Sequence, residues 1–222
     1  MREHRLPGDI ERTSMAIIAR ELTERGVALD PDTAAVVRRV IHATADFDYA
    51  QTLRFTPDAV RLGAAALGRG CDIVTDTNMA RAGVSRVGLD RLGGAVCCFM
   101  AEPAIAAAAK EAGTTRAAAS MVYAAERCPH AVYAVGNAPT ALLKLAELLE
   151  GGLRPALVIG VPVGFVNVVE SKEKLFAACE QYGVPAIAAM GRKGGSTVAA
   201  AVCNALLYLA ADMTDPAKRG WS

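Results

Sequence analysis

A histidine beside two arginines is the first group in this sequence that could do chemistry. Arg38, Arg39 and His42 fall on one face of a helix predicted over residues 31–42, because side chains three and four residues apart are neighbours on a helix. A histidine in a last helical turn commonly interacts with the helix dipole. The alternative is an acid–base imidazole that the guanidinium charges keep neutral. The spacing alone leaves both interpretations open.

Two glycine-rich turns could bind an anion. Residues 136–140 (GNAPT) and 191–197 (GRKGGST) each lead into a predicted helix, and the second turn also carries Arg192 and Lys193. Free backbone N–H groups at the start of a helix attract negative charge. The simpler interpretation is that these glycines only permit tight turns. If the turns do bind an anion, Asn137, Lys193, Gly194 and Ser196 are the candidate contacts.

Neither turn is a nucleotide-binding fingerprint, since the Walker A spacing fails and no G-x-G-x-x-G follows a predicted strand. The anion is therefore expected to be a carboxylate or phosphate of another small molecule. Arg86 and Arg116 are either solvated or part of a site for a ligand with several carboxylates, which guanidinium forks match. No G-x-S-x-G motif and no cluster with metal-ligand spacing is present, so we expect neither a hydrolase triad nor a metal site.

The elements that must position these residues follow from the hydrophobic pattern. Five runs are continuously apolar, as in parallel strands that helices cover on both faces. They span residues 71–75, 95–99, 131–135, 156–161 and 185–190. Helices are predicted between them, with capping residues such as Thr56 and Thr115 before their first turns. The turns discussed above then lie beyond the carboxyl ends of the strands, where open α/β sheets bind ligands.

The predicted fold is a three-layer α/β/α domain over residues 1–222, with a mainly parallel sheet of about five strands. An N-terminal extension over residues 1–50 contributes two helices, at 10–24 and 31–42, that pack on the sheet domain. Asp30 is the expected cap of the second helix.

Composition excludes several classes of function. Lys and Arg number 24 against 23 Asp and Glu, so no basic field favours nucleic acid. The most apolar stretch, residues 196–211, is too short for a membrane span of about 20 residues, and the charged N-terminus is not a secretory signal. The six cysteines form no C-x-x-C pair, which favours reduced, buried thiols in a cytoplasmic protein.

A set of motifs in a fixed order resembles the precorrin-8X methylmutase family over nearly the whole chain. They are residues 10–18 (IERTSMAII), 40–47 (VIHATADF), 73–80 (IVTDTNMA), 83–86 (GVSR), 115–118 (TRAA), 136–142 (GNAPTAL), 160–166 (GVPVGFV), 170–172 (ESK) and 191–196 (GRKGGS). Residues 45–47 and 75–79 are more similar to the anaerobic branch, whose substrate is cobalt-precorrin-8.

The resemblance implies an α/β homodimer that moves a methyl group from C-11 to C-12 of a tetrapyrrole, giving hydrogenobyrinate or, with cobalt in the substrate, cobyrinate. It implies no redox cofactor. The family's catalytic histidine corresponds to His42, and its substrate-contacting serine and arginine correspond to Ser14 and Arg39. Ser85 stands where some relatives have threonine, and Thr13 where relatives often carry a basic residue.

A substrate with many carboxylates would explain both the arginines and the glycine-rich turns. A carrier protein of the same fold without turnover is the alternative function, and the need for a titrating group at position 42 distinguishes the two. A nucleotide-dependent enzyme is disfavoured because the fingerprints are absent.

Overall fold

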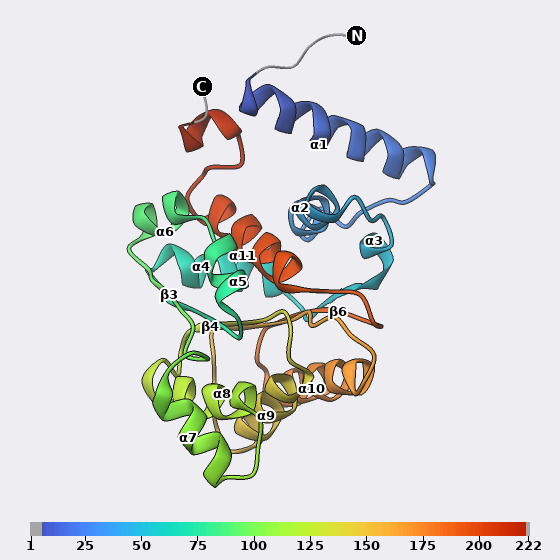
Figure 1. The fold of residues 1–222 in the computed structure, drawn as a ribbon. Coiled ribbons are helices and arrows are strands. Elements are labelled where there is room, and N and C mark those ends of the chain that lie inside the picture. The colour runs from blue at the N-terminus through green and yellow to red at the C-terminus, as the bar shows by residue number, and fades with distance from the viewer. Residues whose placement is uncertain (1–5, 221–222) are drawn as a thin grey trace.

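The computed structural model describes residues 6–220 as two layers of helices around a mixed sheet. In Figure 1, α1, α2, α4, α5, α6 and α11 lie on one side of the sheet and α7, α8, α9 and α10 on the other. This arrangement confirms the predicted three-layer α/β/α class.

The sheet has six strands in the order β1-β6-β5-β4-β2-β3. Its strands are β1 (Leu53–Phe55), β2 (Ile73–Thr75), β3 (Val96–Cys97), β4 (Val132–Val135), β5 (Leu157–Gly160) and β6 (Ala186–Ala189). All five predicted strands are present and mutually parallel. The sequence analysis missed β1, which pairs antiparallel with β6 at one edge, Leu53 opposite Ala189.

The first helical layer contains seven helices with a central member, α11. They are α1 (Pro7–Glu24), α2 (Ala34–Thr44), α3 (Tyr49–Thr52), α4 (Ala59–Gly68), α5 (Asn78–Gly83), α6 (Arg86–Leu92) and α11 (Ser196–Ala210). α11 is apolar on nearly every face and packs against α2, α4, α5 and α6 as well as β4 and β5. Such burial on all sides explains why its sequence is so hydrophobic. α1 packs on α2 and on a short 3₁₀ helix, η1 (Pro216–Arg219).

The opposite layer contains α7 (Pro103–Glu111), α8 (Arg116–Arg127), α9 (Pro139–Glu150) and α10 (Val168–Tyr182). Two large apolar clusters fill the interior. One includes Val40, Ile159 and Leu206 and lies under α11, and the other includes Tyr133, Leu142 and Leu175 and lies under α8 to α10. The continuous apolar runs of the strands supply both clusters, because neighbouring residues of a strand face opposite sides.

Three predicted helix starts are wrong. α1 begins at Pro7 rather than at residue 10, because proline suits the first position of a helix. α2 begins at Ala34 after Thr33, because Asp30 is used in a turn, where its carboxylate accepts from the Asp32 amide at 2.9 Å. α4 begins at Ala59, because the Thr56 hydroxyl does not cap that helix and instead accepts a hydrogen bond from the Ala186 amide of β6 at 2.8 Å.

Candidate active site

A cavity of about 720 Å³ lies between α1, α2, α5 and α11, and His42 is one of its lining residues. Glu11 from α1, Arg39 from α2, Met79 from α5, and Asn204 and Tyr208 from α11 are among its other lining residues. The cavity therefore brings together two residues predicted from sequence, His42 and Arg39, with three polar residues that were not predicted.

His42 lies in the last turn of α2 and is half-buried. Among residues 6–220 no group hydrogen-bonds to its ring. Burial and the positive charge of Arg39 lower the pKa of His42 below its ordinary value, and Glu11 partly opposes this shift. A dipole partner would gain from being charged, whereas this environment favours the neutral imidazole. This environment is compatible with the acid–base interpretation, which stays a prediction.

Arg39 is not free to move in the cavity wall. Its Nη2 donates to Oε1 of Glu11 at 2.6 Å, and both side chains are largely buried, at 14% and 5% exposure. Glu11 also accepts two hydrogen bonds from Arg219 of η1. Two guanidinium groups thus share one carboxylate, and the attractive charges and hydrogen bonds lower the pKa of Glu11 although burial opposes them.

Ser14 lies on α1 one turn beyond Ile10, which lines the cavity. Its hydroxyl donates to the carbonyl oxygen of Ile10 at 2.8 Å, so the hydroxyl oxygen can still accept hydrogen bonds. Ser14 is half-buried beside the cavity without being one of its lining residues.

The 191–197 turn borders the same cavity, because Thr197 lines it. Lys193 forms ion pairs with two aspartates, its Nζ lying 2.7 Å from Oδ2 of Asp46 and 2.6 Å from Oδ2 of Asp48. These bonds raise the pKa of Lys193. Ser196 shares a hydrogen bond of 2.8 Å with Thr77. The predicted contacts of this turn are therefore on the rim, and Lys193 would have to exchange partners to bind an anion.

A buried lysine fixes the shape of this turn. Lys172 of α10 has no exposed surface, and its Nζ donates to the carbonyl oxygens of Gly191 and Lys193, each at 2.8 Å. Gly194 is required nearby, because a Cβ there would lie 2.1 Å from the carbonyl oxygen of Val161. The turn is thus tightly packed against the loop that follows β5.

The 136–140 turn contradicts the prediction of a backbone anion site. Its amides are already occupied by the side chain of Asp76, which is 1% exposed. Oδ1 of Asp76 accepts from the Gly136 amide, and Oδ2 accepts from the amides of Asn137 and Ala138, all at 2.8 Å. An internal carboxylate therefore fills the place predicted for a ligand. Only the exposed side chain of Asn137 is left for a substrate contact.

Arg116 starts α8 at the same rim, since the neighbouring Thr115 hydroxyl shares a hydrogen bond of 2.8 Å with Thr140. Gly136, the residue before Asn137, adjoins Ser196, because a Cβ on Gly136 would lie 2.7 Å from the Ser196 Cα. Arg116 belongs to the helical layer on the other side of the sheet.

Ser85 and Arg86 lie behind Asn204 of the cavity wall and are not lining residues themselves. The Ser85 hydroxyl caps α6 by accepting from the Gly88 amide at 3.3 Å, so it already has a structural partner. The Ser85 amide donates to Oδ1 of Asn204, which lines the cavity. Arg86, the first residue of α6, is exposed.

Sequence reasoning missed Glu11, Tyr208, Arg219, Asp76 and Lys172. Tyr208 and Asn204 did carry a signal, since polar groups inside an apolar helix are usually placed for a reason. Glu11 and Arg219 carried none, because they are 208 residues apart.

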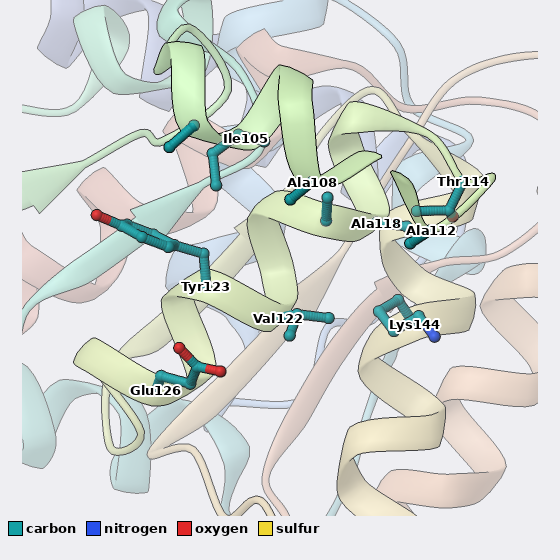
Figure 2. A pocket seen from close by; sticks show the side chains of 11 residues that line it. Ile105, Ala108, Ala112, Thr114, Ala118, Val122, Tyr123, Glu126 and Lys144 are labelled. Atoms are coloured by element: carbon teal, nitrogen blue, oxygen red, sulfur yellow. The ribbon is translucent and has the colours of Figure 1, made fainter. Parts of the chain in front are cut away.

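A second cavity, of about 410 Å³, lies between α7, α8 and α9. Figure 2 shows that Ile105, Ala108, Val122 and Tyr123 form its apolar lining, with Lys144 at one end. The ammonium group of Lys144 is paired with Glu147. This cavity has no group comparable to His42, so it is the weaker candidate for a reaction site.

Within residues 6–220, no group of three or more His, Cys, Asp or Glu side chains could hold a metal ion. All six cysteines are free thiols, and two of them, Cys179 and Cys203, are buried. His130 is at the entrance of β4, where its Nδ1 is 3.3 Å from the Arg154 carbonyl oxygen, and His4 lies outside the described residues. None of the described helices is both long enough and apolar enough to cross a membrane.

Known proteins are similar to this chain along almost its entire length. Residues 9–209 match the family model described as CbiC, precorrin-8X methylmutase. The cobalt-precorrin-8 methylmutase of Salmonella typhimurium is 43% identical over 206 residues, covering 91% of this chain and 95% of that protein. The precorrin-8X methylmutase of Pseudomonas aeruginosa is 44% identical over 200 residues, covering 89% and 93%.

A solved structure, that of the precorrin-8x methyl mutase from Thermus thermophilus, superposes with a TM-score of 0.82 at 43% identity. The superposition covers 91% of this chain and 98% of the other. Sequence and fold thus give the same answer, and the chain belongs to the precorrin-8X methylmutase family.

Proposed function

We propose that His42 is the catalytic residue of an intramolecular methyl transfer from C-11 to C-12 of precorrin-8 or its cobalt form. As a member of this family the chain is an isomerase of corrin biosynthesis. The observation that carries the proposal is a half-buried imidazole without a hydrogen-bond partner among residues 6–220, in a cavity beside Arg39.

A methyl shift around a conjugated ring requires neither a nucleophile nor a hydride. The protein can help by orienting the macrocycle and by supplying a proton or a strong hydrogen bond as the electron distribution changes. Burial and the charge of Arg39 lower the pKa of His42, which favours the neutral ring before substrate binds. Substrate carboxylates nearby would raise that pKa, because an opposite charge stabilises the imidazolium. Substrate binding would thus favour protonation of His42 beside the reacting ring.

Carboxylate recognition is assigned to the cavity wall and the rim. Arg39 keeps further N–H donors beside its bond to Glu11, and Ser14 adds a hydroxyl from α1. The further proposed substrate contacts are Ser85, Arg86, Arg116, Asn137, Lys193, Gly194 and Ser196. Among these, Lys193 and Ser85 must compete with the internal partners described above.

The active form is proposed to be a homodimer whose interface adjoins the cavity. Support comes from large apolar side chains that face solvent around the carboxyl rim, with Phe165 at 82%, Val166 at 77% and Met79 at 71% exposure. Sedimentation that finds a fully active monomer at assay concentration would refute this. We also propose a cytoplasmic location, which suits six free thiols.

The decisive experiment mixes the purified chain with precorrin-8 and with cobalt-precorrin-8 in separate reactions and follows the visible spectrum. Preference for the cobalt form would agree with the names of several relatives, among them those of Priestia megaterium and Salmonella typhimurium. Binding of either compound without any spectral conversion would favour the carrier alternative.

Two variants separate catalysis from binding. His42→Ala should keep the affinity for substrate and lose rate by about 10²–10⁴, the usual contribution of a general acid. Arg39→Ala should mainly weaken binding, because a charged hydrogen bond is worth roughly 1.5–3 kcal/mol. Single-turnover absorbance with saturating substrate and equilibrium titration measure the two effects. A His42→Ala variant that turns over at the wild-type rate would remove the histidine from the mechanism.

A further inference from the structure

Both ends of the chain meet behind the wall of the His42 cavity. Arg219 of η1 is 4% exposed and binds the Glu11 carboxylate with both terminal nitrogens, Nη1 at 2.9 Å from Oε2 and Nη2 at 2.7 Å from Oε1. The Oε1 atom also accepts from Arg39 at 2.6 Å. Glu11 and Arg39 line the cavity, whereas Arg219 does not.

Tyr208 completes this cluster. The guanidinium carbon of Arg219 is 4.4 Å from the centre of the Tyr208 ring, and that of Arg39 is 5.2 Å from it. A planar cation over an aromatic face is held both by charge and by stacking. Each arginine is therefore fixed by two independent contacts, one to Glu11 and one to Tyr208.

Among the described residues, the side chains of Glu11, Arg39 and Arg219 together carry a net charge of +1, since two guanidinium groups share one carboxylate. Among residues 6–220, the charged groups that act on His42 from the neighbouring elements are Glu11 on α1, Arg39 on α2 and, from behind the cavity wall, Arg219 on η1. The side chains that α5 and α11 contribute to the cavity, including those of Met79, Asn204 and Tyr208, carry no charge at neutral pH. Arg39 and Arg219 lower the pKa of His42, and Glu11 raises it.

We propose that Glu11 and Arg219 are positioning residues for the reaction, which fix the Arg39 guanidinium at the cavity wall and set the net charge beside His42. This inference rests on the proposed catalytic role of His42. It makes the segment that follows α11 part of the active-site structure, although none of η1 lines the cavity.

A merely structural role, in which η1 only anchors α1, is the competing explanation. The chain offers a matched control, because Arg12 of α1 and Asp215 before η1 join the same two elements at 3.2 Å. That pair is half exposed, at 52% and 54%, and does not touch Glu11. Asp215→Asn removes its charge while the asparagine oxygen can still cap η1 in place of the carboxylate that now accepts from Ala217.

The first test is the titration of His42 by NMR in the free, full-length protein. The chain has three histidines, so the His42 signal is assigned by its loss in His42→Asn. Glu11→Gln leaves a cluster charge of +2 and should lower the pKa of His42, whereas Arg219→Gln leaves 0 and should raise it. Asp215→Asn should leave it unchanged. Shifts of the same sign in the first two variants, or none, would overturn the proposal.

The second test uses turnover and Arg219→Lys. Lysine restores the charge but not the two-pronged contact, since an ammonium group is a point charge. The pKa of His42 should therefore return toward the wild-type value while KM stays several-fold raised and kcat changes little. A kcat loss in Asp215→Asn equal to that in Arg219→Gln would assign η1 a purely structural role.

Arg219→Lys also serves where Glu11→Gln or Arg219→Gln does not fold. Thermal unfolding of each variant shows whether it folds. If those two variants do not fold, the His42 titration of Arg219→Lys tests only the effect of the Arg219 charge on His42. The failures of the two proposals are distinguishable. Opposite shifts of the His42 pKa with no methyl transfer in any variant would refute the catalytic role and leave the electrostatic coupling standing.

Discussion

Asp76→Asn should destabilise the protein strongly, because the buried carboxylate organises the whole 136–140 turn. An asparagine presents one oxygen where the aspartate presents two. In its better orientation the oxygen keeps the amides of Asn137 and Ala138, and the new NH₂ group faces the Gly136 amide. Two hydrogen bonds then lose their charge assistance, and one buried donor is left without an acceptor.

The expected loss follows from these three changes. Each bond that changes from charged to neutral costs about 1 kcal/mol, and a buried unsatisfied donor costs about 1–3 kcal/mol. The sum is about 3–5 kcal/mol, a large part of a typical folding free energy of about 5–15 kcal/mol. For a chain of this length the melting temperature should fall by roughly 6–20 °C.

Guanidinium chloride unfolding followed by far-ultraviolet circular dichroism measures this loss. Asp72→Asn is the matched control, because the Asp72 side chain accepts a single amide hydrogen bond, from Ala95 at 2.9 Å, which an asparagine oxygen can also accept. Its cost should stay below about 1 kcal/mol. An Asp76→Asn variant as stable as the control would show that the turn does not depend on the carboxylate.

Four further outcomes test the site. Lys172→Met removes the donor of two loop carbonyl groups and should lower stability by about 2–4 kcal/mol and weaken substrate binding, as urea unfolding and equilibrium titration measure. Burial lowers the pKa of Lys172 to about 8 from 10.5. Between pH 8 and pH 10.5 the unfolded chain therefore binds more protons than the folded chain, and the stability of the wild type should rise with pH relative to that of Lys172→Met. Stability profiles that run parallel in the two proteins would contradict this. Gly194→Ala should shift the 191–197 turn and raise the substrate dissociation constant, because its Cβ would clash with the Val161 carbonyl oxygen; unchanged affinity would refute the packing argument. His42 has a lowered pKa, so stability should fall as the pH drops below 6.5, and His42→Asn should flatten that part of the curve in thermal unfolding.

The parts of the fold that could be predicted are those with a strong local pattern. The buried parallel strands are continuous apolar runs, and the residues around α8 carry both a threonine cap and a helical stripe, so that helix begins and ends as predicted. β1 has three residues of mixed burial and pairs with β6, more than 130 residues further along the chain, so no local signal identifies it. α5 and α6 are too short to establish a periodic pattern.

The same reasoning explains the outcome at the site. The positions of His42 and Arg39 follow from one helix, and their association could therefore be predicted. The partners of these two residues come from elements far away in sequence, and spacing carries no information on them. The 136–140 turn was misjudged for a related reason. Its amides point to an anion as expected, but the anion is Asp76, which only the pairing of β2 with β4 brings close.

The pairing of Glu11 with Arg219 has a consequence for the order in which the protein is made. The first helix leaves the ribosome early, whereas its ion-pair partner is added 208 residues later. At a synthesis rate of about 5–20 residues per second, Glu11 and Arg39 exist for roughly 10–40 seconds before Arg219 can join them. During that interval Glu11 can pair with Arg39 but not with Arg219, so the nascent chain cannot yet present the finished charge arrangement to a substrate.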